Sequence, residues 1–333
     1  MDYRRTFLQA LFIFCRERDL DIDQIAALSG VSLSKLNSSS KIEISNQQIE
    51  NIWKNSIQFS NDELMGLHFG ATMQIAALNI VGQIVQTSST VKEALLQVCA
   101  LIHLFTDLYS MQLDEHLDRF SISFMKNKGY DKFPVSQQQM GDFLVAFTLF
   151  EMKGLLLESP KPLKIGLPTY QKANEMQYQM VLKCRLEKTE NHHLVFKNAF
   201  LQTPIITANY EIQTLLLKQI NHLQSPAELN GSFSKRIFNY LLSNAYLFLF
   251  SMETVAGNFN LNVRTLQRKL KAEGLSYLEI VAQVRKALAL YYLKQSSSSI
   301  KEISIILGYA EPSAFVRAFK KWTGKTPSNH RTD

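Results

Sequence analysis

The sequence predicts a mainly α-helical protein, with an N-terminal domain of mixed α and β structure and an all-α C-terminal domain containing two helix-turn-helix motifs joined by a long helix. Two observations lead to this prediction. A short helical hairpin at residues 251–271 is repeated, imperfectly, at residues 303–324, and the basic charge is concentrated around that repeat. With 333 residues, 46% hydrophobic and 20% charged, the chain is long enough for two domains with substantial cores.

The first copy of the repeat is expected to form two short helices joined by a tight turn. Ser251 is placed to cap the first helix, and Asn262 to cap the second. Between them, Asn260 tolerates the left-handed backbone of a tight turn. An apolar stripe on the second helix consists of Val263, Leu266 and Leu270. The other face carries donors suited to phosphates and base edges, namely Arg264, Thr265, Gln267, Arg268 and Lys271.

The second copy aligns with the first if its turn contains one extra residue. Core positions then match core positions, in the pairs Val255 and Ile303, Phe259 and Leu307, Leu266 and Phe315, and Leu270 and Phe319. Pro312 lies near the start of the second basic helix, where its missing N–H costs little. The residues expected to face outward are Ser313, Val316, Arg317 and Lys320. A single hairpin of this kind is also typical of ordinary helical packing, but a tandem pair favours a specialised module.

The charge of the chain is unevenly distributed. The whole sequence has a net charge of +7, yet residues 232–333 contain 15 Lys and Arg against 6 Asp and Glu, and the remainder is close to neutral. A basic module attached to a neutral body is typical of a nucleic-acid-binding domain, although solubility is the alternative explanation.

Cysteine content and the N-terminal segment indicate the compartment. Cys15, Cys99 and Cys184 are widely spaced and form no C-x-x-C motif, so neither a disulfide framework nor a structural metal site is expected. Residues 1–19 resemble an amphipathic helix more than a signal peptide, because Gln9 interrupts the apolar run and four charges follow it. No stretch is long and apolar enough to span a bilayer. We therefore expect a cytoplasmic protein without membrane contact.

The N-terminal body combines helices with strands. A Thr90–Glu93 capping box is expected to open an apolar helix that ends near Leu108, and residues 143–157 predict a helix buried on several sides. Alternation at 120–124 predicts a half-buried strand, and segments 162–168 and 194–196 also read as strands. Residues 22–36 resemble a further helix-turn-helix, but Lys35 is the one basic residue of its second helix, so a structural hairpin is preferred.

A linker is expected at residues 222–231, because the segment is polar and contains Pro226 and Gly231. The predicted domains are therefore residues 1–221 and 232–333, with helix-turn-helix units at 251–274 and 300–324. A continuous helix that begins after Ser276 and ends at the serines 296–299 would be about 27 Å long. It would hold the two units at a fixed separation.

These motifs resemble the C-terminal domain of the AraC/XylS family of bacterial transcription regulators. The resemblance covers about one hundred residues and is strongest in L-G-Y-A-E-P-S-A-F-V-R-A-F and the closing T-P-S-N-H-R. It places recognition positions at Arg264, Gln267 and Arg268 in the first unit and at Ser313, Val316 and Arg317 in the second. Segments such as D-E-L-M-G-L-H-F-G resemble the arabinose-binding-type N-terminal domain of one subgroup, which implies a regulatory domain but neither arabinose as its ligand nor a cupin barrel.

The resemblance implies a sequence-specific transcription regulator, an activator controlled by a small effector of unknown identity. Its expected partners are promoter DNA, RNA polymerase and a second copy of the chain, with no cofactor and no metal. The alternative is an effector-independent regulator whose N-terminal domain serves only dimerisation or protein contacts. A pocket between the helices 91–108 and 143–157 and the strands would suit an effector, but the same residues suffice as ordinary core.

Two other classes of protein remain as alternatives. An enzyme is disfavoured because the sequence contains no G-x-S-x-G, G-x-G-x-x-G, phosphate loop or H-E-x-x-H motif. His192 and His193 would point to opposite faces of a strand, and His103 is expected to be a hydrogen-bonded core residue rather than a ligand. In the second alternative both hairpins bind only protein, and any DNA binding would then show salt dependence without sequence preference.

Overall fold

The computed structural model describes residues 3–38, 43–73, 82, 85, 88–156, 160–205, 232–243, 251–295, 299–309 and 311–331. The chain forms two compact units. The first consists of residues 1–211 together with 257–260, and the second of residues 212–256 and 261–333. The linker expected at 222–231 lies outside the described residues, so the domain boundaries stay a prediction. Among the described helices, none combines the length and the apolar character that crossing a bilayer requires.

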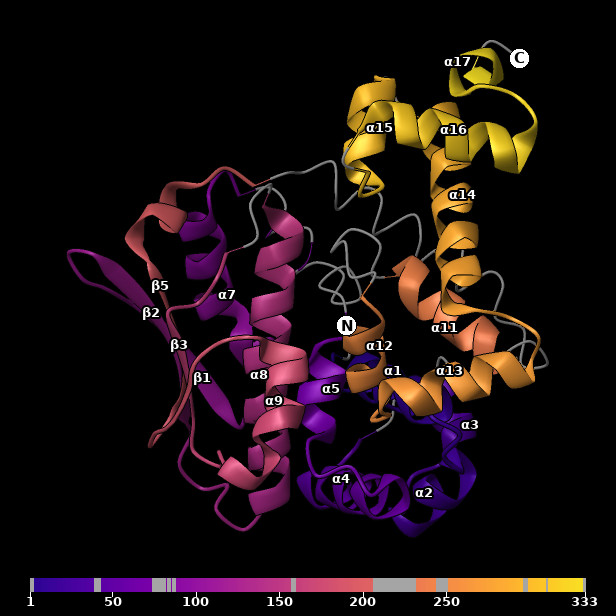
Figure 1. Ribbon diagram of the computed structural model, residues 1–333. Helices are drawn as coiled ribbons and strands as arrows, with labels where there is room; N and C mark the ends of the chain where they lie inside the picture. The colour runs from indigo at the N-terminus through magenta and orange to yellow at the C-terminus, as the bar shows by residue number, and fades with distance from the viewer. Residues whose placement is uncertain are drawn as a thin grey trace. The chain divides into compact units, whose positions relative to one another are not determined.

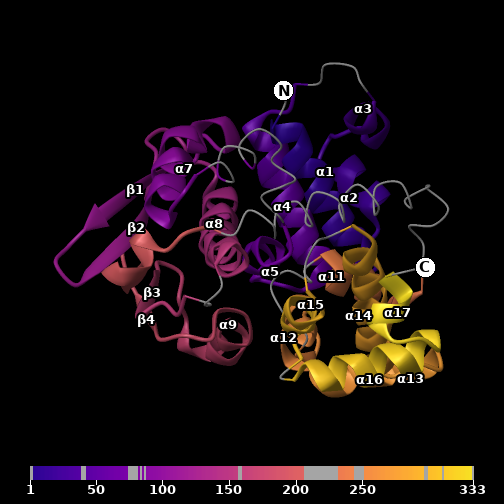
Figure 2. The same cartoon turned by 90° about the horizontal axis from the view of Figure 1, so that it is seen from above.

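The first unit packs helices against one face of a five-stranded sheet (Figures 1 and 2). Its α-helices are α1 (Tyr3–Arg16), α2 (Ile22–Leu28), α3 (Leu33–Asn37), α4 (Asn46–Ser60), α5 (Met65–Gly70), α7 (Val91–Phe105), α8 (Pro134–Leu155) and α9 (Glu175–Leu182). Its strands are β1 (Tyr109–Glu115), β2 (Arg119–Lys126), β3 (Lys164–Leu167), β4 (Leu186–Lys188) and β5 (His192–Lys197). Short 3₁₀ helices span Lys172–Asn174 and Asn198–Gln202.

Among the described residues, the sheet has the order β1-β2-β5-β3-β4, so β1 and β4 are its edge strands. All neighbours are antiparallel except β3 and β4, which run parallel. Strands β2, β3 and β5 confirm the three predicted strand segments. Strands β1 and β4 were not predicted from the sequence, although alternation of Tyr109, Met111 and Leu113 with polar residues in β1 is a strand signal. An open sheet of this order agrees with the expectation that the domain is not a cupin barrel.

Helix α8 begins nine residues before the predicted start at 143, and long-range contacts explain the difference. The Glu50 carboxylate on α4 accepts the backbone N–H groups of Ser136 at 2.7 Å and Val135 at 3.3 Å, which caps the helix from outside its own segment. The buried Gln139 side chain accepts Gly66 N–H at 2.6 Å and donates to Glu63 O at 2.9 Å. Gln139, in a polar stretch that looks like a loop in the sequence, is therefore buried and paired.

Three further expectations for α7 were wrong in detail. The Thr90 hydroxyl accepts the N–H of Glu93, as predicted, but the Glu93 carboxylate accepts the N–H of Ser89 at 2.7 Å instead of completing a capping box with Thr90. The helix ends at Phe105 rather than near Leu108. His103 is exposed, with Nδ1 2.8 Å from Ala100 O, because it lies on the face of α7 turned away from the sheet.

The core of the first unit is aromatic where the N-terminal helices meet α7 and α8. Phe7 and Phe143 lie with ring centroids 5.3 Å apart in an edge-to-face arrangement, which aromatic quadrupoles favour. Further rings of this cluster are contributed by Trp53, Phe69, Phe105 and Phe147. Residues 22–36 form the hairpin of α2 and α3, with Gly30 at φ +69° in its turn, and that hairpin belongs to the first unit.

The second unit is entirely helical in its described residues. Its helices are α11 (Phe233–Ser243), α12 (Met252–Asn258), α13 (Val263–Ala272), α14 (Tyr277–Gln295), α15 (Ile300–Ile306), α16 (Pro312–Thr323) and α17 (Pro327–Arg331). Glu273, just after α13, accepts the backbone N–H groups of Phe233 at 2.6 Å and Ser234 at 2.8 Å. This carboxylate caps α11 and joins it to the first hairpin.

Candidate nucleic-acid interface

The first hairpin has the local geometry that its sequence predicts. The Ser251 hydroxyl accepts the N–H of Thr254 at 3.2 Å, so it caps α12. Asn260 adopts φ +50° in the turn, and Leu261 N–H returns to Ala256 O at 2.8 Å. Asn262 then caps α13 by accepting the N–H of Thr265 at 2.8 Å. Two asparagines therefore form the turn between the helices: Asn260 adopts the left-handed backbone, and Asn262 caps the next helix.

Helix α13 separates a buried face from a basic one. Leu266 and Leu270 are fully buried, whereas Val263, the third residue of the predicted stripe, is half-buried. Of the predicted site residues, Thr265 is half-buried and the exposed ones are Arg264, Gln267, Arg268 and Lys271. The exposed side thus combines cationic and amide donors, the groups that contact phosphates and the edges of guanine and adenine.

The second hairpin repeats this arrangement with larger core residues. Phe315 and Phe319 are fully buried on α16, with ring centroids 5.8 Å apart. Pro312 occupies the first turn as predicted, and Gly308 takes φ +73° in the turn before it. Val316 is half-buried, and the exposed members of the predicted site are Ser313, Arg317 and Lys320. All four aligned core pairs of the repeat are buried, which confirms the proposed register.

Helix α14 connects the two hairpins. Its 19 residues correspond to roughly 28 Å at the α-helical rise, and Figure 1 shows α13 near one end and α16 near the other. A capping box at its start pairs Ser276 with Glu279, whose carboxylate accepts Ser276 N–H at 2.7 Å. The buried residues Ile280, Val284 and Leu288 fix the helix against its neighbours. The connector is therefore rigid and of defined length.

Two cations near the interface have packing partners that the sequence alone did not reveal. Lys269 Nζ lies 5.2 Å from the centre of the Phe233 ring on α11, and the Arg285 guanidinium lies 4.8 Å from that of Tyr309. Because both cations cover aromatic rings, we assign them to packing within the unit. The positions of Lys269 and Arg285 in the sequence do not distinguish them from the basic residues that are predicted to contact DNA.

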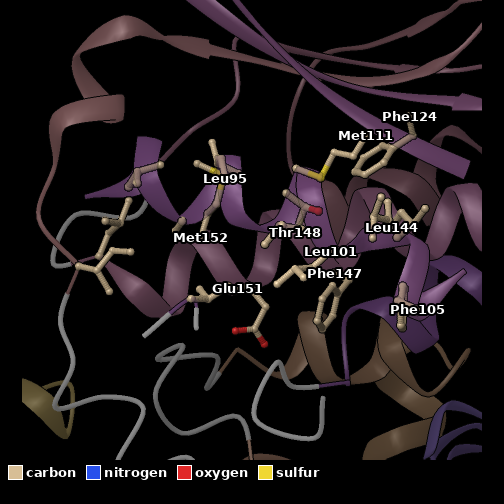
Figure 3. A pocket seen from close by; sticks show the side chains of 17 residues that line it. Leu95, Leu101, Phe105, Met111, Phe124, Leu144, Phe147, Thr148, Glu151 and Met152 are labelled. Carbon is tan, nitrogen blue, oxygen red and sulfur yellow. The ribbon is translucent and has the colours of Figure 1, made fainter. Parts of the chain in front are cut away.

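A cavity in the first unit lies where the sequence allowed either a pocket or ordinary core. It has a volume of about 70 Å³ and is bounded by α7, α8 and the strands β1 and β2 (Figure 3). Its lining is formed by Val85, Val91, Ala94, Leu95, Val98, Leu101, Ile102, Phe105, Met111, Phe124, Leu144, Phe147, Thr148, Glu151, Met152, Leu156 and Ile205. Among the described lining residues, the polar ones are Thr148 and Glu151, both on α8.

Three histidines of the first unit, His68, His192 and His193, lie beside carboxylates. His192 Nε2 lies 3.1 Å from Asp142 in the buried interior, whereas the neighbouring His193 faces Glu187 at 3.6 Å. The two rings thus point to opposite faces of β5, as predicted. His68 lies 2.8 Å from Asp62; burial alone would raise the pKa of Asp62, but His68 lowers it below the usual value. Within the described ranges, no three His, Cys, Asp or Glu residues converge as metal ligands would.

Comparison with known proteins identifies the family. The family model described as "Arabinose-binding domain of AraC transcription regulator" matches residues 20–205, and a helix-turn-helix domain model matches residues 255–333. The chain belongs to the AraC family of transcription regulators. It is therefore a DNA-binding regulator with an arabinose-binding-type N-terminal domain, and its hairpin at residues 22–36 lies within that domain match.

Two relatives from Pseudomonas aeruginosa are themselves named as regulators. The chain is 26% identical over 271 residues to the ornithine utilization regulator of Pseudomonas aeruginosa, covering 80% of this chain and 78% of that protein. It is 41% identical over 81 residues to the regulator VqsM of the same organism, covering 24% of this chain and 25% of VqsM. The crystal structure of CdpR, also from Pseudomonas aeruginosa, is 20% identical and covers 93% of this chain and 96% of CdpR, with a TM-score of 0.43.

Proposed function

We propose that this AraC-family regulator activates transcription by reading promoter DNA with α13 and α16 and by sensing a small effector in the cavity of its first unit. The observation that carries the DNA-reading part is the repeated hairpin. Each copy buries one face of its second helix and exposes donors on the other. Two such helices on a rigid connector suit consecutive major-groove segments on one side of a duplex, about 34 Å apart per turn.

The exposed residues receive roles from their chemistry. Arg264, Arg268 and Arg317 are assigned to guanine or phosphate, and Gln267 to adenine, because their donors and acceptors match those edges. Lys271 and Lys320 are assigned to phosphates, which carry no sequence information. Thr265 on α13 and Ser313 on α16 each offer a hydroxyl to the DNA. Val316 on α16 is apolar and suits contact with a thymine methyl group.

Selection of bound duplexes from genomic fragments tests the DNA-reading proposal. The full chain is expected to enrich two short motifs whose centres lie about one helical turn, 10–10.5 base pairs, apart. Binding that weakens with salt but enriches no motif would contradict it and favour the hairpins as protein-binding elements.

The cavity supports the effector-sensing part of the proposal. Its walls come from two helices and the sheet of the domain that matches the arabinose-binding family. One relative, the ornithine utilization regulator, is named for control of the use of a small molecule. We therefore propose a small-molecule effector for this chain, without assigning its chemical class.

Transcription from a selected promoter with purified RNA polymerase tests control and direction together. Addition of the regulator is expected to raise transcript yield, and a small-molecule extract of the host cells is expected to change that yield. Equal yields with and without extract would instead support an effector-independent regulator whose first unit mediates dimerisation. Sedimentation of the full chain with and without its DNA site measures dimerisation directly.

A further inference from the structure

The two edges of the described sheet differ in how they are protected. Strand β4 forms one edge with three residues and ends in the exposed Lys188. A short, charged strand of this kind resists pairing with another chain. Strand β1 forms the other edge with seven residues, and its register with β2 runs without a bulge. It contains neither proline nor lysine, and its charges are confined to Asp114 and Glu115 at one end, so most of β1 is an unprotected edge.

The outer side of β1 carries backbone groups that the sheet does not use. At one end of the β1–β2 pair, Asn127 N–H donates to Leu108 O at 2.9 Å, and at the other His116 N–H donates to Arg119 O at 2.8 Å. Because hydrogen-bonded positions alternate along an antiparallel pair, the even-numbered residues of β1 point their N–H and C=O groups toward β2. The odd-numbered residues point theirs away from the sheet, and they are Tyr109, Met111, Leu113 and Glu115. Within the described part of the chain, no residue hydrogen-bonds to these outward groups.

We propose that β1 pairs antiparallel with β1 of a second copy of the chain, around a two-fold axis at Gln112. Met111 of one copy then lies opposite Leu113 of the other, and Tyr109 lies opposite Glu115. Each such pair exchanges two backbone hydrogen bonds, and the two-fold axis doubles the pairs, so about eight bonds join the copies. An axis at Met111 or Leu113 would leave one outward-pointing residue of β1 without a partner strand. The inference adds a contact surface to the dimerisation considered above and does not depend on an effector.

The side chains on the solvent face of β1 fit this register. Gln112 lies opposite its own counterpart, and Ser110 lies opposite Asp114 of the second copy. Two amides can each donate and accept a hydrogen bond, and a hydroxyl can donate to a carboxylate. An axis at Asp114 would instead place two carboxylates opposite each other, which is destabilising. With the axis at Gln112 no like charges face each other directly, so β1 is complementary to a second copy of itself.

Helix α7 offers further surface for this contact. It packs against β1, and Figure 2 shows the two elements side by side at one end of the sheet. Its exposed apolar side chains include Leu96 at 50% and Leu104 at 38% of their surface. A two-fold axis perpendicular to the sheet puts α7 of both copies on the same face of one continuous sheet. Stable interfaces bury about 800 Å² per partner, more than a strand pair alone provides, and the leucines of α7 supply apolar surface for the remainder.

Cysteine cross-linking of the full chain tests the register. The background carries Cys99→Ser and Cys184→Ser, which leaves the buried Cys15 as the one native cysteine. Opposite residues at a non-hydrogen-bonded position have Cα atoms about 4.5 Å apart, a distance that a disulfide can bridge. Gln112→Cys should therefore form covalent dimers on oxidation. Ser110→Cys, on the same face of the same strand, is the matched control and should stay monomeric on a non-reducing gel, because its counterpart would lie about 14 Å away.

Sedimentation of the full chain without DNA measures the dimer independently, and the wild type is expected to sediment as a dimer. Gln112→Lys and Gln112→Glu each place like charges at the axis and should each weaken dimerisation by about fivefold. An equal mixture of the two variants should recover it, because lysine then faces glutamate. Lys188→Glu changes the charge at the other edge of the sheet and should sediment as the wild type does.

Three results would overturn the β1 interface: a monomeric wild type, Ser110→Cys that cross-links as fully as Gln112→Cys, or a dimer that neither charged variant at Gln112 weakens. The proposed function is measured separately, by DNA selection and transcript yield. A monomer that still enriches the two DNA motifs would refute the interface and keep the DNA-reading proposal. A β1 dimer that enriches no motif would keep the interface and refute that proposal.

Discussion

Two glutamates each cap a helix that lies elsewhere in the sequence. Glu50 on α4 caps α8, and Glu273 after α13 caps α11, each by accepting two backbone N–H groups at the start of the distant helix. Those N–H groups have no partner within their own helix, and a negative charge there also complements the helix dipole. A residue that reads as an ordinary surface glutamate in the sequence therefore determines how two elements join.

Replacement of Glu273 tests this role. Glu273→Ala should destabilise the second unit by about 1 kcal/mol at pH 7, the usual value of a helix cap. Burial tends to raise the pKa of Glu273, but hydrogen bonds from Ser234 and Phe233 lower it below its ordinary 4.5. The stabilisation is therefore complete above that value and is lost as pH falls through the lower folded-state pKa.

Urea denaturation of both proteins between pH 3 and 7 measures the effect, and the difference should shrink at the acidic end. Glu311→Ala is the matched control, because Glu311 precedes α16 without a side-chain capping bond. A destabilisation by Glu273→Ala that is no larger than that by Glu311→Ala would refute the capping role.

The proposed DNA contacts differ in the effect that their removal should have. Arg268→Ala is expected to cost about 1–3 kcal/mol of binding free energy and to relax specificity at one base pair. Lys271→Ala should weaken binding to all sequences alike, because a phosphate contact does not read bases. Titration of the selected duplex and its single-base variants distinguishes them, with Gln283→Ala on the exposed side of α14 as control. Arg268→Ala with unchanged affinity and specificity would sink the assignment.

At the scale of elements, α14 sets the separation of the two reading helices. Its 19 residues form one continuous helix whose buried face packs within the second unit. A connector of this kind does not stretch to follow DNA sites that are moved apart. We therefore expect the length of this one helix to set the spacing of the two motifs in the DNA.

Altered DNA spacing tests the rigidity without changing the protein. Insertion of 5 base pairs between the selected motifs turns one of them to the opposite side of the duplex. Affinity should then fall to that for a duplex with a single motif, and insertion of a full turn should not restore it. Quantitative gel-shift titrations measure both cases. Equal affinity for the original and the 5-base-pair insertion would show that the connector is flexible or that one hairpin alone reads DNA.

Across the whole molecule, the excess positive charge lies in residues 232–333, while the rest of the chain is nearly neutral. Neutralisation of phosphates releases counterions, so the logarithm of the binding constant falls linearly with the logarithm of salt concentration. This division of charge predicts that the second unit accounts for the salt dependence of binding.

Salt titrations of single variants test this division. Lys271→Ala and Lys320→Ala should each reduce the slope by about one, because each removes one proposed phosphate contact. Lys161→Ala, which removes an exposed cation from the first unit, should leave the slope unchanged. A reduced slope in Lys161→Ala would place part of the DNA contact on the first unit.

By itself, the sequence determined the two hairpins, the caps of the first hairpin at Ser251 and Asn262, the cap of the connecting helix at Ser276 and the register of the two cores. These features depend on residues three or four positions apart, so their physics is contained in short segments. The exposed faces of α13 and α16 follow from the same periodicity. The roles of their side chains at DNA remain predictions, because exposure alone does not select a base.

Other features depend on contacts between residues that are far apart in the sequence, and only the tertiary structure decided them. The start of α8 depends on Glu50, some 85 positions away in the chain, and burial of Gln139 depends on a partner on α5. The exposure of His103 depends on which side of α7 meets the sheet. The cavity arises because α7, α8, β1 and β2 meet without filling the space between them, and a packing defect of this kind has no signature in local sequence.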